Sequence, residues 1–168
     1  MAKNMRQLLG ILLVLGTFGI GGCAATEGTY VSVKNYTRGE YYLQQNQYEE
    51  CTAKFKPASE AHPSDANAHY YLGRCYLALE QNRPALTHLK EAVTLDQGNP
   101  DFHFWQGVAY AANGKSRSEE TSYGDALAID PDHVQALVYL CHNRVEAGQY
   151  RRALGYYNRA LKNDPYVP

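Results

Sequence analysis

The sequence predicts an all-α protein, a right-handed α-solenoid of four stacked helical hairpins, because residues recur at intervals of 34. Three registers carry the interval: glycine at Gly39, Gly73 and Gly107, tyrosine at Tyr42, Tyr76 and Tyr110, and alanine at Ala58, Ala92, Ala126 and Ala160. A small residue suits a close crossing of two helices, and an aromatic ring fills the space beside that crossing. Each copy is therefore expected to form two antiparallel helices.

The ends of the copies follow from turn and capping residues. The four copies are expected at residues 32–65, 66–99, 100–133 and 134–167. Before the third copy, Gly98 suits a helix end, Asn99 suits an N-cap and Pro100 suits the first turn of the next helix. Asp65 and Asp132 are predicted to cap the first helices of copies two and four.

The turn inside each hairpin is predicted at one register, which holds Asn46, Glu80, Gly114 and Gly148. Glycine adopts a left-handed backbone without strain, asparagine tolerates it, and glutamate is less suited to it. We therefore expect four turns of one conformation, with the second carrying the least suitable residue.

Copies three and four depart from the pattern. Glu119 stands where alanine is expected, and with Ser116 it forms a capping box that is predicted to bond the start of its helix. In the fourth copy Cys141 replaces the glycine and Arg144 replaces the tyrosine. The first helix of that copy is therefore expected to pack less tightly.

The repeat resembles that of the tetratricopeptide repeat family, most clearly in the second copy through Leu72, Gly73, Tyr76, Ala85, Leu89 and Ala92. The resemblance implies a non-enzymatic protein–protein interaction scaffold whose first helices line a concave groove. Carried over register by register, the ligand-facing positions of the family fall on Tyr36, Glu40, Leu43, Asn67, Tyr70, Arg74, Leu77, Asp101, Phe104, Val108, Val138, His142 and Glu146.

Four of these residues share one register, and we predict that Tyr36, Tyr70, Phe104 and Val138 form an apolar ladder for a hydrophobic segment or helix of a partner. The alternative is that the rings simply cover neighbouring helices. Arg74 is expected either to pair with an acidic group of a bound peptide or to be an ordinary solvated arginine. Some family members grip a C-terminal carboxylate with a lysine and an asparagine of the first repeat; this sequence has neither residue at those places.

The first 22 residues are predicted to be a lipoprotein signal peptide. Two basic residues precede an apolar run over 8–20, which is short for a transmembrane helix. The run ends in Ile20-Gly21-Gly22-Cys23, which resembles a lipobox, so Cys23 is expected to carry the lipid and residues 23–31 to form a tether. The alternative is an ordinary secretory signal with an incidental cysteine. Ala24 resembles the outer-membrane sorting class, which predicts lipid anchoring to the bacterial cell envelope, at the outer membrane facing the periplasm.

The remaining cysteines and two histidines are predicted to be structural. Cys51 and Cys75 fall on faces that meet, so a disulfide is one interpretation and two buried thiols are the other. At least one of the three cysteines after Cys23 stays unpaired within the monomer. His69 and His103 share a register that usually holds a core aromatic, and we predict that both are core residues.

Composition and motifs exclude several function classes. A formal net charge of -1 gives no basic footprint for nucleic acid. The sequence has no metal-binding spacing, no phosphate-cradling loop and no nucleophile with a matched base. It therefore predicts no enzyme, no metal and no cofactor.

We therefore predict a scaffold that holds an envelope protein or peptide segment in its groove. Repeat lipoproteins resembling this one assist pilus-secretin assembly, export or outer-membrane protein assembly. The alternative is an accessory subunit of an envelope enzyme or electron-transfer complex. The last copy is not followed by a polar capping helix, and exposure of Leu154, Tyr157 and Leu161 predicts self-association or a further partner there.

Overall fold

The computed structural model describes residues 39–166, and every regular element in that range is a helix. Residues 39–44 are helical, and seven longer helices follow in chain order: α3 (Tyr48–Ala61), α4 (Ala66–Ala78), α5 (Asn82–Leu95), α6 (Pro100–Ala112), α7 (Ser116–Ile129), α8 (Val134–Glu146) and α9 (Tyr150–Asn163). None of these helices is long and apolar enough to cross a bilayer. Tyr36, Cys23 and the expected signal peptide lie outside the described residues.

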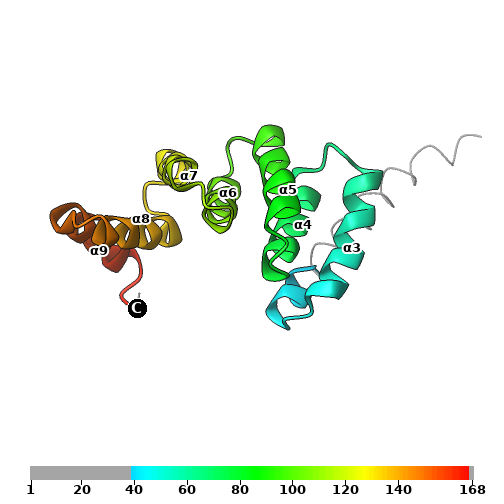
Figure 1. Cartoon of the computed structure of the whole chain (residues 1–168), viewed down its shortest axis with the longest axis horizontal. Coiled ribbons are helices and arrows are strands. Elements are labelled where there is room, and N and C mark those ends of the chain that lie inside the picture. Colours follow the sequence, from blue (N-terminus) through cyan, green and yellow to red (C-terminus); the bar gives the residue numbers. More distant parts are fainter. Residues whose placement is uncertain (1–38, 167–168) are drawn as a thin grey trace, which may run out of the picture.

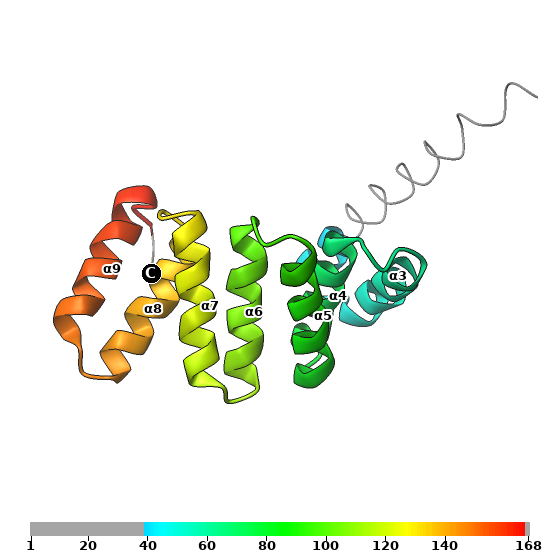
Figure 2. The ribbon, with the colours of Figure 1, turned by 90° about the horizontal axis from the view of Figure 1, so that it is seen from above.

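The helices form a row of antiparallel hairpins. Helix α4 pairs with α5, α6 with α7 and α8 with α9, and each hairpin packs on the next (Figure 1). Figure 2 shows the row from α3 to α9 lying side by side in chain order. Helices α4 and α6 also contact each other, so the first helices of these two hairpins share one side of the array. The predicted all-α solenoid is confirmed.

Inside the hairpins, a glycine on the first helix lets a large side chain of the second helix pack directly over its backbone. A Cβ atom added to Gly107 would lie 2.5 Å from Tyr123 Cε1, and one added to Gly73 would lie 2.5 Å from Leu89 Cγ. Tyr123 and Leu89 are fully buried as a result. The repeated glycine therefore sets how closely the two helices approach.

The fourth hairpin lacks this arrangement, as the sequence predicted. Cys141 occupies the glycine register, and the aromatic side chain that should cover it, Tyr157, is 36% exposed. Arg144, in the tyrosine register, is half-buried and forms an ion pair with Glu120 of α7. The Cβ and Sγ atoms of Cys141 occupy the space that a glycine would leave open, so Tyr157 stays at the surface.

The four hairpin turns have one conformation. Asn46, Glu80, Gly114 and Gly148 all have positive φ, between 58° and 70°. In the second turn the amide of Glu80 donates to Leu77 O at 2.9 Å, and the next amide donates to Tyr76 O at 2.8 Å. This bonding satisfies two carbonyls at the end of the first helix, and in the second turn it holds a glutamate in a left-handed conformation.

Two helix caps were predicted correctly and one was predicted wrongly. Asp65 accepts from the amides of Asn67 and Ala68, and Asn99 caps α6 with proline in the first turn. The cap of α8 is not Asp132 but His133, whose Nδ1 accepts from Ala136 N at 3.2 Å. His133 is buried against the array, so its ring reaches the open amide from inside.

The expected capping box in the third hairpin is also wrong. Helix α7 has its N-cap at Lys115, and Ser116 is already helical. Glu119 Oε1 accepts instead from Asn143 Nδ2 of α8 at 3.1 Å. The register of Glu119 faces the next hairpin, so its carboxylate lies across the junction and away from the start of its own helix.

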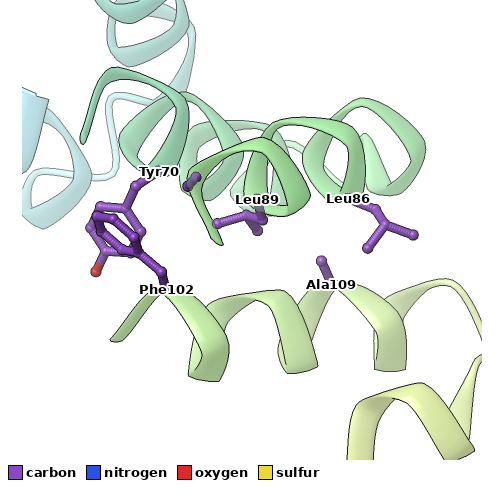
Figure 3. Close-up of a cluster of buried hydrophobic side chains, with 6 residues drawn as sticks. Tyr70, Leu86, Leu89, Phe102 and Ala109 are labelled. Carbon is purple, nitrogen blue, oxygen red and sulfur yellow. The ribbon is translucent and has the colours of Figure 1, made fainter. Parts of the chain in front are cut away.

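Two of the three junctions between consecutive hairpins join residues that are 24 positions apart, and the remaining one is an apolar contact. The first joins Cys51 to Cys75 in a disulfide, with a Cα–Cα distance of 5.8 Å. The third joins Glu119 to Asn143 by the hydrogen bond described above. In the second, Leu86 and Leu89 of α5 pack with Ala109 of α6 in one buried cluster (Figure 3). The disulfide settles the choice that the sequence left open, and Cys141 is a free thiol.

Candidate functional site: a hollow around Arg74

A hollow of about 330 Å³ lies where the first two described hairpins meet α6. Its lining comes from the 39–44 helix, α3, α4 and α6: Leu43, Tyr48, Arg74, Leu77, Ala78 and Trp105. The structure thus brings together three of the residues predicted to line the groove, Leu43, Arg74 and Leu77. A hollow with a mostly apolar wall and one charged group suits an apolar side chain beside an acidic group.

The guanidinium of Arg74 is held among aromatic rings. Its Cζ atom lies 4.5 Å from the ring centroid of Trp105 and 5.2 Å from that of Tyr70, within the range of cation–π attraction. Its Nη1 donates to Tyr70 Oη at 3.1 Å. Burial raises the pKa of Tyr70 to about 12, so its hydroxyl stays neutral and accepts this bond. The rings therefore fix the position of the charge.

The charge of Arg74 has no direct counter-ion among the described residues. None of the ion pairs in residues 39–166 includes Arg74, and its buried Nε atom has no hydrogen-bond partner there. A buried N–H without a partner is costly, so a carboxylate that reached it would gain a charge-assisted bond. Arg74 is thus not the ordinary solvated arginine that the sequence left as an alternative.

Two nearby carboxylates are engaged with other groups. Asp101 Oδ1 lies 3.1 Å from His133 Nε2, and since His133 Nδ1 accepts a backbone proton, Nε2 is the donor. This bond lowers the pKa of Asp101, with a smaller contribution from Arg74. Glu40 Oε2 accepts from Tyr71 Oη at 3.3 Å. Both carboxylates lie at the edge of the site and leave Arg74 available.

The predicted ladder is not an exposed surface. Tyr70 and Phe104 are both buried: Tyr70 packs on Phe102 at a centroid distance of 4.9 Å, and Phe104 packs on Tyr123 at 5.7 Å. The prediction that these two rings face a ligand is therefore wrong, because neighbouring helices cover them, as the alternative stated. Val138 is half-buried against the cluster of Leu137 and Ala160.

The remaining predicted groove residues lie outside the hollow. Asn67 is exposed at the start of α4, and Val108 is half-buried beside the cluster that contains Phe104. His142 Nε2 and Glu146 Oε1 lie 3.2 Å apart on the exposed surface of α8. The predicted groove residues that line the hollow therefore all belong to the first two repeat copies.

Three residues of the hollow, Tyr48, Ala78 and Trp105, were not predicted from the sequence. Trp105 is the only tryptophan of the chain and stands one position after Phe104, in the same register as Tyr71. Tyr71 and Trp105 both approach the guanidinium of Arg74. The sequence did contain a signal for this pair, because Tyr71 and Trp105 are 34 residues apart. Each follows directly after a residue of the predicted ladder, Tyr70 or Phe104.

The two predicted core histidines are buried, as expected. His69 Nε2 bonds Pro63 O at 3.1 Å, and His103 Nε2 bonds Gln97 O at 3.0 Å, which is the same bond one repeat later. His69 also faces His88, with 3.0 Å between their Nδ1 atoms. Both histidines thus serve packing between a helix and the loop before it.

The geometry defines an α-solenoid with a hollow on the side of its first helices. The tetratricopeptide repeat family model matches residues 36–100 and 76–134, more than half of the chain. The chain belongs to the tetratricopeptide repeat family. No curated protein sequence is significantly similar to it.

Solved structures show the same fold. The crystal structure of MamA matches with a TM-score of 0.69 and 19% sequence identity, covering 78% of this chain and 77% of that chain. MamA from Desulfovibrio magneticus gives 0.68 at 18% identity, covering 78% and 74% of the two chains. TTC0263, a thermophilic repeat protein of this family from Thermus thermophilus, gives 0.71 at 22% identity, covering 79% and 73%. At these identities the likeness concerns the fold.

Proposed function

We propose that this protein is a non-enzymatic scaffold of the bacterial cell envelope that holds a segment of an envelope protein in the hollow around Arg74. Membership of the family supports a protein–protein interaction role in general. The observation that carries the specific proposal is the guanidinium of Arg74, which is fixed by Tyr70 and Trp105 and has an unpartnered Nε atom at an apolar hollow.

The expected ligand follows from the chemistry of this wall. Leu43 and Leu77 provide an apolar surface, and Arg74 provides one positive charge. A peptide with an apolar side chain next to an Asp, a Glu or its own C-terminal carboxylate satisfies both features. Family members that bind a C-terminal carboxylate use a set of polar residues, whereas this hollow has two leucines and one arginine. We therefore expect it to bind an internal hydrophobic segment in preference to a charged C-terminal tail.

Attachment to the envelope is the second part of the proposal. A lipid on Cys23, followed by the tether over 23–31, would place the repeats beside the membrane, at the outer membrane facing the periplasm. In that position the scaffold would assist assembly of an envelope complex. The disulfide between Cys51 and Cys75 supports this location, because structural disulfides persist in oxidising compartments.

Photocrosslinking tests the hollow. A photoreactive amino acid replaces Leu77 in the full chain, expressed in its bacterial host, and an equivalent chain labelled at Ile129, exposed at the end of α7, is the matched control. We expect one dominant envelope protein linked at 77 and absent at 129. Arg74→Gln should reduce its yield by about tenfold, equivalent to about 1.4 kcal/mol, while Arg74→Lys should restore little because it lacks the planar stack. Equal labelling at both positions would refute groove binding.

Fractionation tests the anchor separately. Cys23→Ser should move the protein from the membrane fraction to the soluble fraction, because one acyl-bearing residue supplies the attachment. Retention of the Cys23→Ser variant in membranes would refute lipid anchoring and leave the proposal for the hollow intact.

A further inference from the structure

The last helix of the array has an exposed apolar stripe. Tyr150 is 69% exposed and Leu154 is 58% exposed, and Tyr157, one turn further along α9, is also open to solvent. These residues follow each other at intervals of four and three, so they lie on one face of the helix. Apart from Tyr166, no large hydrophobic side chain in residues 39–166 is more exposed than Tyr150 and Leu154.

The equivalent face is covered in an earlier hairpin. Leu86 of α5, in the register of Leu154, is buried in the cluster that includes Phe102 and Ala109 of α6 (Figure 3). In the third hairpin the register of Leu154 holds Glu120, which forms the ion pair with Arg144 of α8. The shape that fits the α9 face is therefore a helix lying as the first helix of a following hairpin would lie.

The opposite end of the array offers such a helix. Tyr41, in the 39–44 helix, is 56% exposed and ranks next after Tyr150 and Leu154 among the exposed hydrophobic side chains. It holds the register of Ala109 and Asn143, two residues that face the preceding hairpin. The spacing of 24 at the first and third junctions would place Tyr41 of a second molecule against Ala153 and the neighbouring Leu154. Figure 2 shows residues from 39 onward and α9 at opposite ends of the row.

Charge disfavours the alternative contact, in which two α9 helices pack on each other. The first repeat copy, residues 32–65, holds four Lys or Arg and five Asp or Glu, whereas the last, residues 134–167, holds five and two. Helix α9 itself has Arg151, Arg152, Arg159 and Lys162 and no carboxylate. A two-fold contact between two α9 faces would bring these like charges together, whereas the first repeat copy, with a net charge of -1, does not repel α9.

We propose that copies of this protein associate head to tail, with α9 of one copy packed against the 39–44 helix of the next. This contact continues the stacking of hairpins across two molecules, and it is separate from the hollow around Arg74. A contact that is not two-fold leaves one free end on each side, so association extends beyond dimers.

The test uses the full chain purified from membranes in detergent and two variants, each with one damaged end. Tyr41→Asp damages the first end and Leu154→Glu the second, whereas Ile129→Glu is the control at an exposed apolar residue on α7. Circular dichroism confirms folding of each. We expect the parent and the control to form dimers and larger species in sedimentation velocity, and each end variant alone to weaken association about tenfold or more.

Mixing the two end variants gives the decisive outcome. Each retains one intact end, so the mixture should form a one-to-one dimer that grows no further. If Tyr41→Asp alone still dimerises and Leu154→Glu does not, the contact is two-fold through α9 and the proposal is wrong. If the parent stays monomeric but binds vesicles of anionic phospholipid or an acidic partner helix through Leu154, α9 serves another occupant and the proposal is also wrong.

Discussion

The third and fourth hairpins use the same register in opposite ways. In the third, Gly107 lets Tyr123 lie over the backbone and become fully buried. In the fourth, Cys141 occupies the glycine place and Tyr157 remains 36% exposed. The difference shows that, within one repeat pattern, a single small residue decides whether the aromatic partner belongs to the core or to the surface.

The largest test of this comparison removes both rings. We expect Tyr123→Ala to lower the free energy of unfolding by about 3–5 kcal/mol, because a fully buried aromatic leaves a cavity. Tyr157→Ala, in the same register, should cost less than about 1.5 kcal/mol because much of its ring is already solvated. Urea denaturation followed by circular dichroism measures both. Equal losses would mean that the fourth hairpin is as closely packed as the third.

The second test concerns the junctions. Residues 24 apart are joined by a disulfide between Cys51 and Cys75 and by a hydrogen bond between Glu119 and Asn143. Replacing both cysteines by alanine should cost about 3 kcal/mol through the looser unfolded chain. Asn143→Ala should cost about 1 kcal/mol, since Glu119 loses one donor. Thermal unfolding with and without reductant measures the first effect, and a Cys141→Ser protein should respond to reductant as the parent does.

A third test compares the turns. Gly114→Ala places a Cβ atom in a left-handed conformation and should destabilise by about 1–2 kcal/mol. Glu80→Gly removes that strain and should stabilise by up to about 1 kcal/mol. The two substitutions change the same register in opposite directions, so their melting temperatures should move in opposite directions. A fall in both would show that the side chain of Glu80 makes a stabilising contact.

The smallest expected effect is on the pH dependence of stability, which should differ between the second and third hairpins. Burial, reinforced by the neighbouring His69, lowers the pKa of His88, which donates from Nδ1 to His69. A lowered pKa favours the neutral ring, so its contribution is present above the unfolded pKa of about 6.5 and is lost as pH falls through the folded value. His88→Gln should show a smaller fall in melting temperature between about pH 7.5 and 5. The third hairpin has Ser122 in this register, bonded to Gln106. Ser122→Ala should leave the pH dependence unchanged.

The regular features of the fold were predictable because each depends on one residue type at one place. A glycine under a large side chain, a left-handed turn and an Asn–Pro helix start are local requirements, and each is found where it was predicted. Contacts between consecutive hairpins were harder to predict from the sequence. Glu119 satisfies a capping pattern in sequence, yet its carboxylate bonds α8, because the orientation of successive hairpins determines which groups meet.

The site was predictable in part for the same reason. Arg74 and Leu77 lie on one helix, so helical spacing alone places them together. Trp105 reaches Arg74 from α6, and Tyr70 is covered by Phe102 of that helix. Both facts depend on how closely α4 and α6 approach, which the sequence pattern does not specify. The prediction therefore located the charged centre of the hollow but misjudged which rings face it.

The disulfide between Cys51 and Cys75 also determines the order in which the array comes apart. In a linear array each hairpin is stabilised by its neighbours, so opening starts where the junctions are weakest. The disulfide at the first junction resists opening. The fourth hairpin has a partly exposed aromatic side chain, Tyr157, and no disulfide. Under a protease the chain should shorten from its C-terminal helices first, and a fragment that keeps both bonded cysteines should survive longest.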